Sequence, residues 1–462
     1  MSGLLQNPRA RAVAAVVALV PAIVAVAQLG RLHPDEVFQT LEPANFRAFG
    51  FGILAWEWQV GLRNWAVPGL FAWILQLGAA VGINDPLARR ALLEVPQLAL
   101  HFAMLLAVYR LTARRLQVGP PWLALVAIPL VGLYGPVIHF AGRTMGESFS
   151  TAFLVIAVER LDAARGRAWH VAATAGALLG LAVVTRYGSA VMVVAALGWL
   201  IATRAWRPLL FTVLGGLAVA LALGALDWAT WGAPFHSLRK YIDFNVTSGQ
   251  AAAQFGSEPA WFYLPHLGWL VLWAWPGLLL GFVRRSEGAW LAAFCALAYV
   301  VAISLTAHKE ARFLYPGLVL LLVAATPAWL AWLGRLEPER GRLLVGASLA
   351  AGLAILAFKS PFQPERPEQF RLVVKAARSA TGLVIVNEGV WGAPGFFYLG
   401  KNIPWFPCDF AEDGRFQQAM VTPSFNRAVI WDDRALAQLQ QAGFEVLETD
   451  GPAKLLGRGS PQ

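Results

Sequence analysis

The run AVAAVVALVPAIVAVAQL, residues 12–29, is followed after three residues by the tetrapeptide HPDE at 33–36. An α-helix of about 20 apolar residues is long enough to cross the hydrocarbon core of a bilayer. The run therefore predicts a membrane-spanning helix with a charged segment at its end. No cleavage pattern of small residues stands out after it, so we expect an anchor that is retained rather than a signal peptide.

Similar apolar runs recur along most of the 462 residues, of which 58% are hydrophobic and 14% charged. Soluble proteins carry about 25% charged residues. We therefore expect a polytopic α-helical membrane protein with about 11 transmembrane helices. The predicted spans are 11–30, 91–109, 119–138, 147–160, 169–185, 188–203, 208–226, 264–283, 289–306, 313–333 and 343–358.

The apolar segment 65–83 decides the topology of everything that follows it. If this segment lies on the membrane surface and the N-terminus is inside, every compact arginine cluster except Arg89/Arg90 faces the cytoplasm, in agreement with the positive-inside rule. If it crosses, those clusters face outward. We therefore expect a surface segment, and a C-terminus on the extracytoplasmic side.

The net charge of +10 comes from the part of the chain before Ser360, because the tail from Ser360 holds ten basic and eleven acidic residues. Short arginine-rich loops between apolar runs account for this excess as a topology signal, so we expect no nucleic-acid partner. We predict a transmembrane domain over 1–359, with a first extracytoplasmic loop and surface helices at 31–90. Residues 360–462 are predicted to form a small extracytoplasmic α/β domain, with strands near 383–386 and 427–431 and a helix near 435–442.

The HPDE segment places carboxylates beside the membrane. Pro34 suits the first turn of a helix, on which Asp35, Gln39 and Glu42 would share one face. Asp35 and Glu36 either complement the dipole of this helix or provide a general base, and the spacing leaves both interpretations open.

The segment Trp56-Glu57-Trp58 with Arg63 lies on the same predicted face of the membrane. Its aromatic residues are typical of interface anchors. The alternative is a sugar platform, in which the rings stack on pyranose faces and Glu57 accepts hydroxyl protons.

Arg143-Thr144 and Glu147-Ser148 lie between two apolar runs at this face as well. Contact with lipid headgroups and binding of substrate are equally good interpretations.

The stretch His308-Lys309-Glu310-Ala311-Arg312 holds four ionisable groups in five residues between long apolar segments. Such groups are costly at a membrane boundary unless they are paired or used. They bind either lipid headgroups or a lipid-linked phosphate, whose oxygens a guanidinium grips in a bidentate manner. The remaining histidines show no metal-ligand spacing, so neither a metal nor a cofactor is expected.

The loop 227–263, rich in glycine and aromatic residues, is either a lid or a plain connector.

Together these segments resemble glycosyltransferase family 22, the Alg-type and GPI-anchor mannosyltransferases of the GT-C superfamily. The matching motifs, in the family's order over roughly residues 31–316, are HPDEVFQTLEPAN (33–45), AWEWQVGLRN (55–64), RTMGES (143–148), the FNV…G…FG…WFY series (244–263) and HKEARFLYP (308–316).

The resemblance implies a GT-C fold and transfer of mannose from a polyprenyl-phosphate donor to a glycan or glycolipid, with inversion and formation of an α-mannoside. It implies that Asp35 is the general base, with Glu36 beside it as a catalytic residue that positions the acceptor. Contacts to the donor phosphate would come from His308, Lys309 and Arg312. The residues expected to bind substrate are His33, Gln39, Trp56, Glu57, Arg63, Arg143 and Glu147. Two departures, Thr185-Arg186-Tyr187-Gly188 in place of a proline-containing motif and Glu147 in place of an amide, bear on the acceptor more than on the reaction.

Two alternatives remain. One is another GT-C transferase that moves a pentose or a modified sugar from a polyprenyl phosphate. The other is a lipid or solute transporter, which would require mid-span polar residues and internal repeats that are not evident here. Expected partners are the lipid-linked donor, the acceptor and membrane lipids. The bias of 31 Arg against 6 Lys favours a bacterial plasma membrane, with the site facing outside, over the endoplasmic reticulum.

Overall fold

The computed structural model describes residues 8–116, 119–164, 168–285, 288–386, 389–409, 414–431 and 433–459. The chain forms two compact units, each with its own core. Unit 1 comprises Met1–Val24, Gly61–Ala66 and Pro96–Gln363, and unit 2 comprises Ala25–Val60, Val67–Val95 and Pro364–Gln462.

Unit 1 is helical. Its longer helices are α1 (Pro8–Ala27, which continues into unit 2), α5 (Pro86–Arg115, which begins in unit 2), α8 (Gly146–Ala163), α9 (Trp169–Thr185), α10 (Ala190–Ala202), α11 (Trp206–Trp231), α15 (Ala274–Val283), α16 (Trp290–Leu305), α17 (Tyr315–Leu333) and α18 (Pro338–Ala354). Shorter pieces are η2 (Pro121–Val126), α6 (Ala127–Gly132), α7 (Gly135–Phe140), η3 (Tyr187–Ser189), α12 (His236–Ile242), η4 (Asp243–Thr247), α13 (Gln250–Phe255), α14 (Tyr263–His266), η5 (Leu267–Trp269), η6 (Ala311–Leu314) and η7 (Ile355–Ala357).

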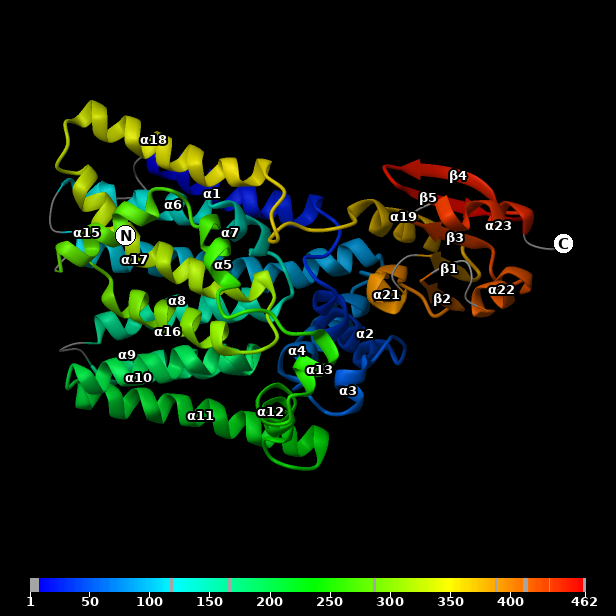
Figure 1. Ribbon diagram of the computed structural model, residues 1–462, viewed down its shortest axis with the longest axis horizontal. Helices are drawn as coiled ribbons and strands as arrows, with labels where there is room; N and C mark the ends of the chain where they lie inside the picture. Colours follow the sequence, from blue (N-terminus) through cyan, green and yellow to red (C-terminus); the bar gives the residue numbers. More distant parts are fainter. Residues whose placement is uncertain are drawn as a thin grey trace. The chain divides into compact units, whose positions relative to one another are not determined.

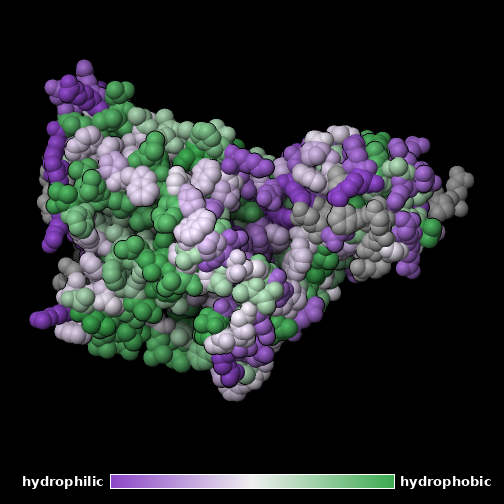
Figure 2. Space-filling view, viewed as in Figure 1, coloured by the Kyte–Doolittle hydropathy of each residue, from purple (hydrophilic) through white to green (hydrophobic). Residues whose placement is uncertain are grey.

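Helix α17 forms the core of this unit (Figure 1), and α6, α8, α15 and α16 pack against it. In its most apolar stretch 89% of the residues are buried, compared with 17% for α11 and 11% for α18. Figure 2 accordingly shows hydrophobic side chains spread over the outside of the helices. Apolar helices that expose their side chains in this way are suited to contact with lipid.

Helices α9 and α11 pack closely because glycine lies at their contact. A Cβ atom added at Gly176 would overlap the carbonyl oxygen of Thr212, and one at Gly215 would overlap that of Ala173. Small residues of this kind let two backbones approach within a membrane, where packing rather than the hydrophobic effect holds helices together.

Four helices of the described residues are long and apolar enough to cross a membrane: Pro86–Arg115, Trp206–Trp231, Ala311–Leu333 and Pro338–Ala357. The pair Tyr263–Trp269 and Ala274–Val283 has the same character but is bent by 101°. Shorter apolar helices are Ala66–Ala80, Trp122–Gly132, Trp169–Thr185, Tyr187–Ala202 and Trp290–Leu305. Most predicted spans are therefore helices, whereas the count of 11 crossings stays a prediction.

The span predicted at 119–138 is not a single helix, and whether it crosses the membrane stays a prediction. This stretch is divided into η2, α6 and α7, with a turn at Leu133–Tyr134. Pro129 and Pro136 lack the N–H that a continuous helix requires, and Gly132 and Gly135 flank the turn. Apolar composition alone did not reveal these breaks.

Unit 2 contains a mixed sheet with strand order β2-β1-β3-β5-β4. Strand β1 (Leu383–Val386) is parallel to β2 (Trp405–Cys408) and β3 (Arg427–Ile430), while β5 (Ala453–Gly457) is antiparallel to β3 and to β4 (Glu445–Asp450). The strands predicted near 383–386 and 427–431 are confirmed, as is the helix near 435–442, found as α23. The helices of the unit are η1 (Glu36–Leu41), α2 (Glu42–Phe49), α3 (Trp56–Gln59), α4 (Ala66–Ala80), α19 (Pro367–Ala377), α20 (Gly389–Gly392), α21 (Gly395–Leu399), α22 (Gly414–Val421), η8 (Asp433–Ala435) and α23 (Leu436–Gln441).

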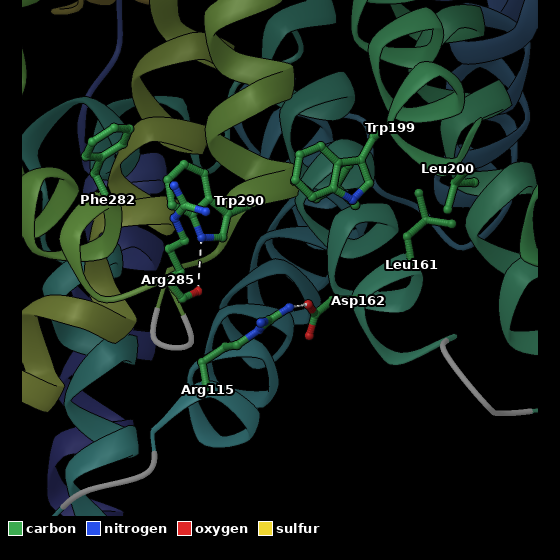
Figure 3. Close-up of a pocket in the computed structure, with 9 residues that line it drawn as sticks. Arg115, Leu161, Asp162, Trp199, Leu200, Phe282, Arg285 and Trp290 are labelled. Atoms are coloured by element: carbon green, nitrogen blue, oxygen red, sulfur yellow. Dashed lines mark hydrogen bonds and ion pairs between the residues drawn. The ribbon is translucent and has the colours of Figure 1, made fainter. Parts of the chain in front are cut away.

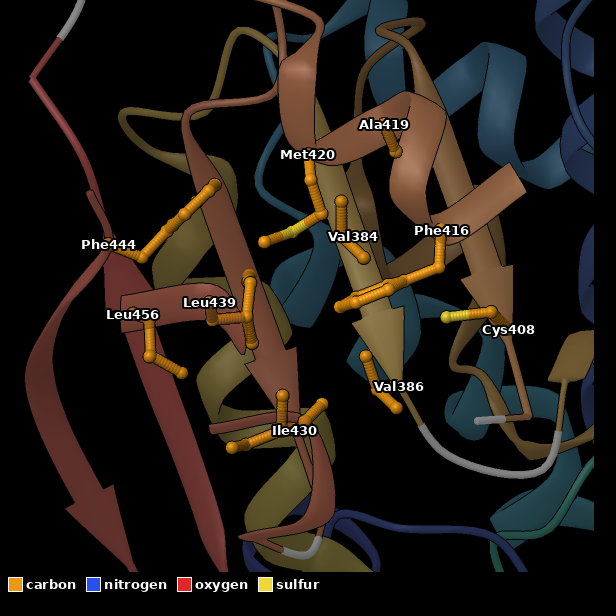
Figure 4. Close-up of a cluster of buried hydrophobic side chains, with 12 residues drawn as sticks. Val384, Val386, Cys408, Phe416, Ala419, Met420, Ile430, Leu439, Phe444 and Leu456 are labelled. Atoms are coloured by element: carbon orange, nitrogen blue, oxygen red, sulfur yellow. The ribbon is translucent and has the colours of Figure 1, made fainter. Parts of the chain in front are cut away.

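The sheet has an apolar layer on each face because its inner strands alternate buried side chains. Val384 and Val386 contribute to one layer with Phe416, Leu439 and other residues shown in Figure 4. The alternate residues of β1 face the second layer, which contains residues of α19. Two buried faces explain why the strand LVIV is apolar throughout.

Residues 25–60 pack with the C-terminal part of unit 2. The backbones of Arg31 and Glu365 exchange hydrogen bonds of 3.2 and 2.7 Å, and the ring of Phe38 meets Trp391 edge-on at 5.2 Å. The domain predicted over 360–462 stays a prediction. In the structure its sheet belongs to one compact unit with residues 25–60 and 67–95.

Candidate active site

The carboxylate of Glu147 joins two guanidinium groups within unit 1. Glu147 lies in the first turn of α8, and its Oε1 accepts hydrogen bonds from Arg186 at 2.6 Å and from Arg312 at 3.1 Å. The Glu147 side chain is 2% exposed. Two cations thus compensate the burial of this carboxylate. We call Glu147, Arg186 and Arg312 the Glu147 cluster.

The HKEAR stretch supplies a second carboxylate to this cluster. Glu310 receives two hydrogen bonds from Arg312, from Nε at 2.7 Å and from Nη2 at 3.1 Å, which is the bidentate geometry of a guanidinium with a carboxylate. The imidazole Nε2 of His308 lies 3.1 Å from Oε1 of the same group. Arg312 therefore bridges Glu147 and Glu310.

Lys309 has a different environment from the one its motif predicts. Its ammonium donates to the carbonyl oxygens of Glu258, at 2.6 Å, of Ala307, at 3.4 Å, and of Thr306, and the residue is 6% exposed. Its three protons are thus directed at backbone oxygens. The backbone N–H of Glu258 also donates to Ala307, so Lys309 holds the loop before α14 against the HKEAR stretch.

Aromatic rings line the cluster. The guanidinium groups of Arg186 and Arg312 lie over the Phe313 ring, 4.7 and 4.9 Å from its centre. The hydroxyl of Tyr299 donates to the carbonyl of Phe313 at 2.8 Å. Arg186, Arg312 and Lys309 contribute three formal positive charges, and Glu147 and Glu310 contribute two negative ones. The formal sum is therefore one positive charge. Cations over an aromatic face in a region of low dielectric constant attract an anion.

The loop predicted over 227–263 as either a lid or a connector is largely helical, with α12, η4 and α13 inside it. Asp227, fully buried, accepts hydrogen bonds from the N–H and the hydroxyl of Ser237. Together with the hydrogen bonds at Glu258, these contacts hold the loop near both of its ends.

Arg143, 2% exposed, lies close to α5, where Gln97 donates to its carbonyl at 2.7 Å.

In unit 2, Asp35 lies at the start of η1 with its carboxylate beside an imidazole. Its Oδ1 is 3.2 Å from Nδ1 of His33, and its backbone N–H is 3.3 Å from the same nitrogen. A neutral ring accepts from that N–H, whereas a protonated ring pairs with the carboxylate. The His33 and Asp35 side chains are 32% and 24% exposed, so both remain accessible to a substrate hydroxyl.

The neighbouring Glu36 is 3% exposed, and its Oε2 accepts a hydrogen bond from the N–H of Leu32 at 3.1 Å. Its carboxylate therefore holds the backbone of the segment that follows α1. Arg90, which was an exception to the arginine pattern, is buried as well: it pairs with Glu94 at 2.8 Å and donates to the carbonyl of Gln28 at 3.1 Å. Its charge therefore serves a contact inside unit 2.

The residues of the predicted sugar platform differ in burial. Trp58 belongs to the core, with its indole N–H donating to the carbonyl of Phe38. Trp56 and Gln39 are half-buried, and Glu57 is buried at 9%. Arg63 lies in unit 1, where its carbonyl accepts a hydrogen bond from Trp231. The predicted sugar platform is thus divided: Trp56, Glu57 and Trp58 belong to unit 2, as does Gln39, and Arg63 belongs to unit 1.

Glu42, which the helical pattern placed on one face with Asp35 and Gln39, is a buried carboxylate. Its Oε1 accepts from the N–H of Phe397 at 2.6 Å and its Oε2 from that of Ile53 at 2.7 Å. Burial raises its pKa to about 7, although the hydrogen bonds from Phe397 and Ile53 lower it. A Cβ at Gly395 would overlap this carboxylate, so glycine is required there.

Arg186 and Glu310 were also absent from the predicted site. A signal for Arg186 existed, because a lone arginine between two apolar runs requires a partner. The partner, Glu147, is 39 residues away in the sequence, and pairing over such a separation is not visible in a local pattern.

The sequence model of the Alg9-like mannosyltransferase family matches residues 12–362. The chain belongs to this family. The match includes the HPDE segment, the Glu147 cluster and the HKEAR stretch, so the family resemblance of those motifs is confirmed.

Relatives of this Alg9-like protein include GPI mannosyltransferase 3 of Yarrowia lipolytica, 31% identical in an alignment of 324 positions, which covers 65% of this chain and 60% of that protein. GPI mannosyltransferase 3 of Eremothecium gossypii is 28% identical in an alignment of 380 positions, which covers 65% of this chain and 62% of that protein. The matched part of the chain thus spans about three fifths of the length of these relatives.

Among solved structures, ArnT from Cupriavidus metallidurans bound to undecaprenyl phosphate is similar, with a TM-score of 0.62 and 16% identity over 97% of this chain and 98% of that one. The GT-C fold expected from the sequence is therefore confirmed, as helical bundle and C-terminal sheet together.

Proposed function

We propose that the chain transfers mannose from a polyprenyl-phosphate donor to a hydroxyl of a glycan or glycolipid, with inversion, so that a β-linked donor yields an α-mannoside. Family membership supports the sugar, and the relatives' names support the reaction. The similar ArnT structure holds undecaprenyl phosphate, a polyprenyl phosphate, which supports the donor class.

The observation that carries the proposal is the Glu147 cluster. Its two guanidinium groups are held side by side by one carboxylate and one phenyl face. In the reaction the bond between C1 of the sugar and the phosphate oxygen breaks, and its electron pair stays on the phosphate. Arg186 and Arg312 would stabilise that charge without reorganising, since they are already aligned. His308 would assist, and Lys309 would contribute charge and hold the loop.

Asp35 would act on the acceptor. Its carboxylate removes the hydroxyl proton as the oxygen attacks C1 from the face opposite the phosphate, and a new C–O bond forms. His33 would orient this carboxylate through Nδ1, and the buried Glu36 would fix the backbone on which Asp35 lies. Gln39, Trp56, Glu57, Arg63 and Arg143 stay proposed substrate-binding residues.

The test uses the full chain in membranes with a synthetic polyprenyl-phosphate mannose and with its arabinose counterpart. Extracted glycolipids are the acceptors, and mass spectrometry is the readout. We expect mannosylated product from the first donor. Product from the arabinose donor alone would overturn the choice of sugar, and solute uptake into liposomes without any sugar transfer would indicate a transporter.

Asp35→Asn is expected to lower transfer by about 10²- to 10⁴-fold, the usual contribution of a general base, while the protein remains in the membrane. Asp85→Asn is a matched control, because Asp85 caps the start of α5 through Oδ1 and asparagine caps equally well. Transfer by Asp35→Asn equal to that by Asp85→Asn would remove Asp35 from the mechanism.

The membrane in which the enzyme acts is part of the proposal. The two curated relatives come from eukaryotes and give no support to the bacterial plasma membrane expected from the arginine bias. An endoplasmic reticulum membrane, the alternative, agrees better with them. Immunogold labelling of cells that express the tagged chain would separate the two.

A further inference from the structure

One cavity of unit 1 has no role in the proposed reaction. It has a volume of about 460 Å³ and lies among the ends of α8, α10, α15 and α16 (Figure 3). Its lining residues are Arg115, Leu161, Asp162, Trp199, Leu200, Phe282, Arg285, Trp290 and Leu291. We call it the Arg285 cavity.

The Arg285 cavity lies at the opposite end of the bundle from the Glu147 cluster. Helix α8 begins beside Glu147 and reaches the cavity at Leu161 and Asp162, so its 18 residues separate the two by roughly 25 Å. Helix α16 runs in the other direction, from Trp290 at the cavity to Leu305, shortly before His308. A ligand in the cavity is therefore not a substrate of the cluster.

The charge of the cavity is positive. Asp162 is already neutralised, because Arg115 pairs with its Oδ1 and Arg114 lies 3.2 Å from its Oδ2. Arg285 is exposed at the rim, and it takes part in no ion pair among the described residues. Figure 3 shows Arg285 beside Trp290, apart from the Arg115–Asp162 pair. The lining thus offers one guanidinium to an anion from outside.

The remaining walls are aromatic and aliphatic. Trp199 and Trp290 face the cavity from two helices in Figure 3, and the Trp290 indole donates to the carbonyl of Arg285 at 3.0 Å, which fixes the rim. Beyond the rim, α15 and α16 expose large apolar side chains: Leu279 at 63%, Phe282 at 63%, Val283 at 70% and Leu297 at 61%. An occupant that enters past Arg285 therefore has an apolar path beside it.

We infer that the Arg285 cavity binds the phosphate headgroup of an anionic glycerophospholipid, with its acyl chains along α15 and α16. A guanidinium grips phosphate oxygens, tryptophan is favoured at the level of lipid headgroups, and the apolar path suits a chain but not a free anion. This combination selects a membrane lipid over inorganic phosphate.

The test is native mass spectrometry of the full chain in detergent, titrated with phosphatidylglycerol, phosphatidylcholine or inorganic phosphate. Phosphatidylglycerol is expected to bind at least about fivefold more tightly than phosphatidylcholine. Arg285→Gln should remove this preference, and Arg284→Gln, the adjacent arginine that does not line the cavity, should keep it. Trp199→Leu should weaken both lipids.

Equal binding of the two lipids would overturn the inference, and so would an unchanged preference in Arg285→Gln. Displacement of phosphatidylglycerol by millimolar inorganic phosphate would identify a site for a free anion instead. Arg285 is exposed, so its substitution is expected to leave folding intact, and a monodisperse elution profile checks this. None of these measurements depends on sugar transfer.

Discussion

Glu147 in unit 1 and Glu42 in unit 2 are both fully buried, yet they are stabilised in different ways. Glu147 lies between two guanidinium groups. Glu42 receives hydrogen bonds from backbone N–H groups, and burial raises its pKa to about 7. A carboxylate paired with two guanidinium groups holds those cations side by side, whereas one surrounded by amides connects two chain segments. Burial alone therefore does not distinguish a functional carboxylate from a structural one.

The largest expected effect comes from removing the charge of Glu147. Glu147→Gln leaves Arg186 and Arg312 adjacent without a shared carboxylate, and breaking such a buried pair costs about 3–5 kcal/mol. Thermal unfolding of the full chain in detergent would measure the loss. Glu337→Gln, in an exposed pair with Arg340, is the control and should change little. Equal melting temperatures for the two variants would contradict the buried-pair interpretation.

Glu42 is expected to make stability depend on pH. Its folded pKa of about 7 exceeds the unfolded value of 4.5, so the folded state keeps the proton while the unfolded state loses it. The free energy of unfolding should therefore fall by about 3 kcal/mol as the pH rises from 4.5 to 7.

The check is denaturant unfolding across this range for the wild type and for Glu42→Gln. The difference between the two curves should vary with pH, because glutamine does not titrate. A constant difference would show that Glu42 titrates alike in both states and would contradict its raised pKa.

Lys309 extends the comparison of buried charged groups to a cation, which backbone carbonyl groups bind. Lys309→Met removes hydrogen bonds to the carbonyl oxygens of Glu258 and Thr306, with an expected cost of about 1–3 kcal/mol. Limited proteolysis near Glu258 should become faster. Transfer should fall less than in Arg312→Met. The reverse order of activities would indicate that Lys309 contacts the donor.

The smallest effect is expected at an exposed pair on the sheet. Asp450 accepts two hydrogen bonds from Arg371, and this contact lowers its pKa. The pair therefore stabilises the fold at neutral pH and loses its contribution as the pH falls below the usual range near 4. Asp450→Asn should cost at most about 1 kcal/mol at pH 7, measured by thermal unfolding. A loss as large as that for Glu147→Gln would contradict the role of burial.

Helix positions and the family motifs could be predicted because both are local patterns. Apolar runs placed α8 to α11 and α16 to α18 within a few residues, and strand β1 was apolar enough to recognise. The break at Leu133–Tyr134 was not predicted. Hydropathy does not register it, because proline and glycine interrupt the helix without making the run less apolar.

Pairings between distant segments could not be predicted in the same way. The helical pattern placed Glu42 on a polar face with Asp35 and Gln39, but the π-helical segment η1 changes the spacing and α21 covers Glu42 from far along the chain. Lys309 was assigned to phosphate by its motif, although carbonyl groups, including that of Glu258, surround its ammonium. The sequence shows the sign of the charge at Glu42 and Lys309, but not the distant groups that bind these side chains.

The π-helical geometry of η1 also links chain length to the direction of the Asp35 carboxylate. Hydrogen bonds from residue i to i+5 accommodate one residue more than an α-helix does over the same path. Deleting one residue within 37–41 would allow a regular α-helix to continue into α2. Because the shortened α-helical segment would follow the same path, Asp35 would keep its direction and Glu42 its place. The loss of a single codon in this segment is thus expected to keep the proposed base in place, whereas the same deletion in an α-helix would turn it by about 100°.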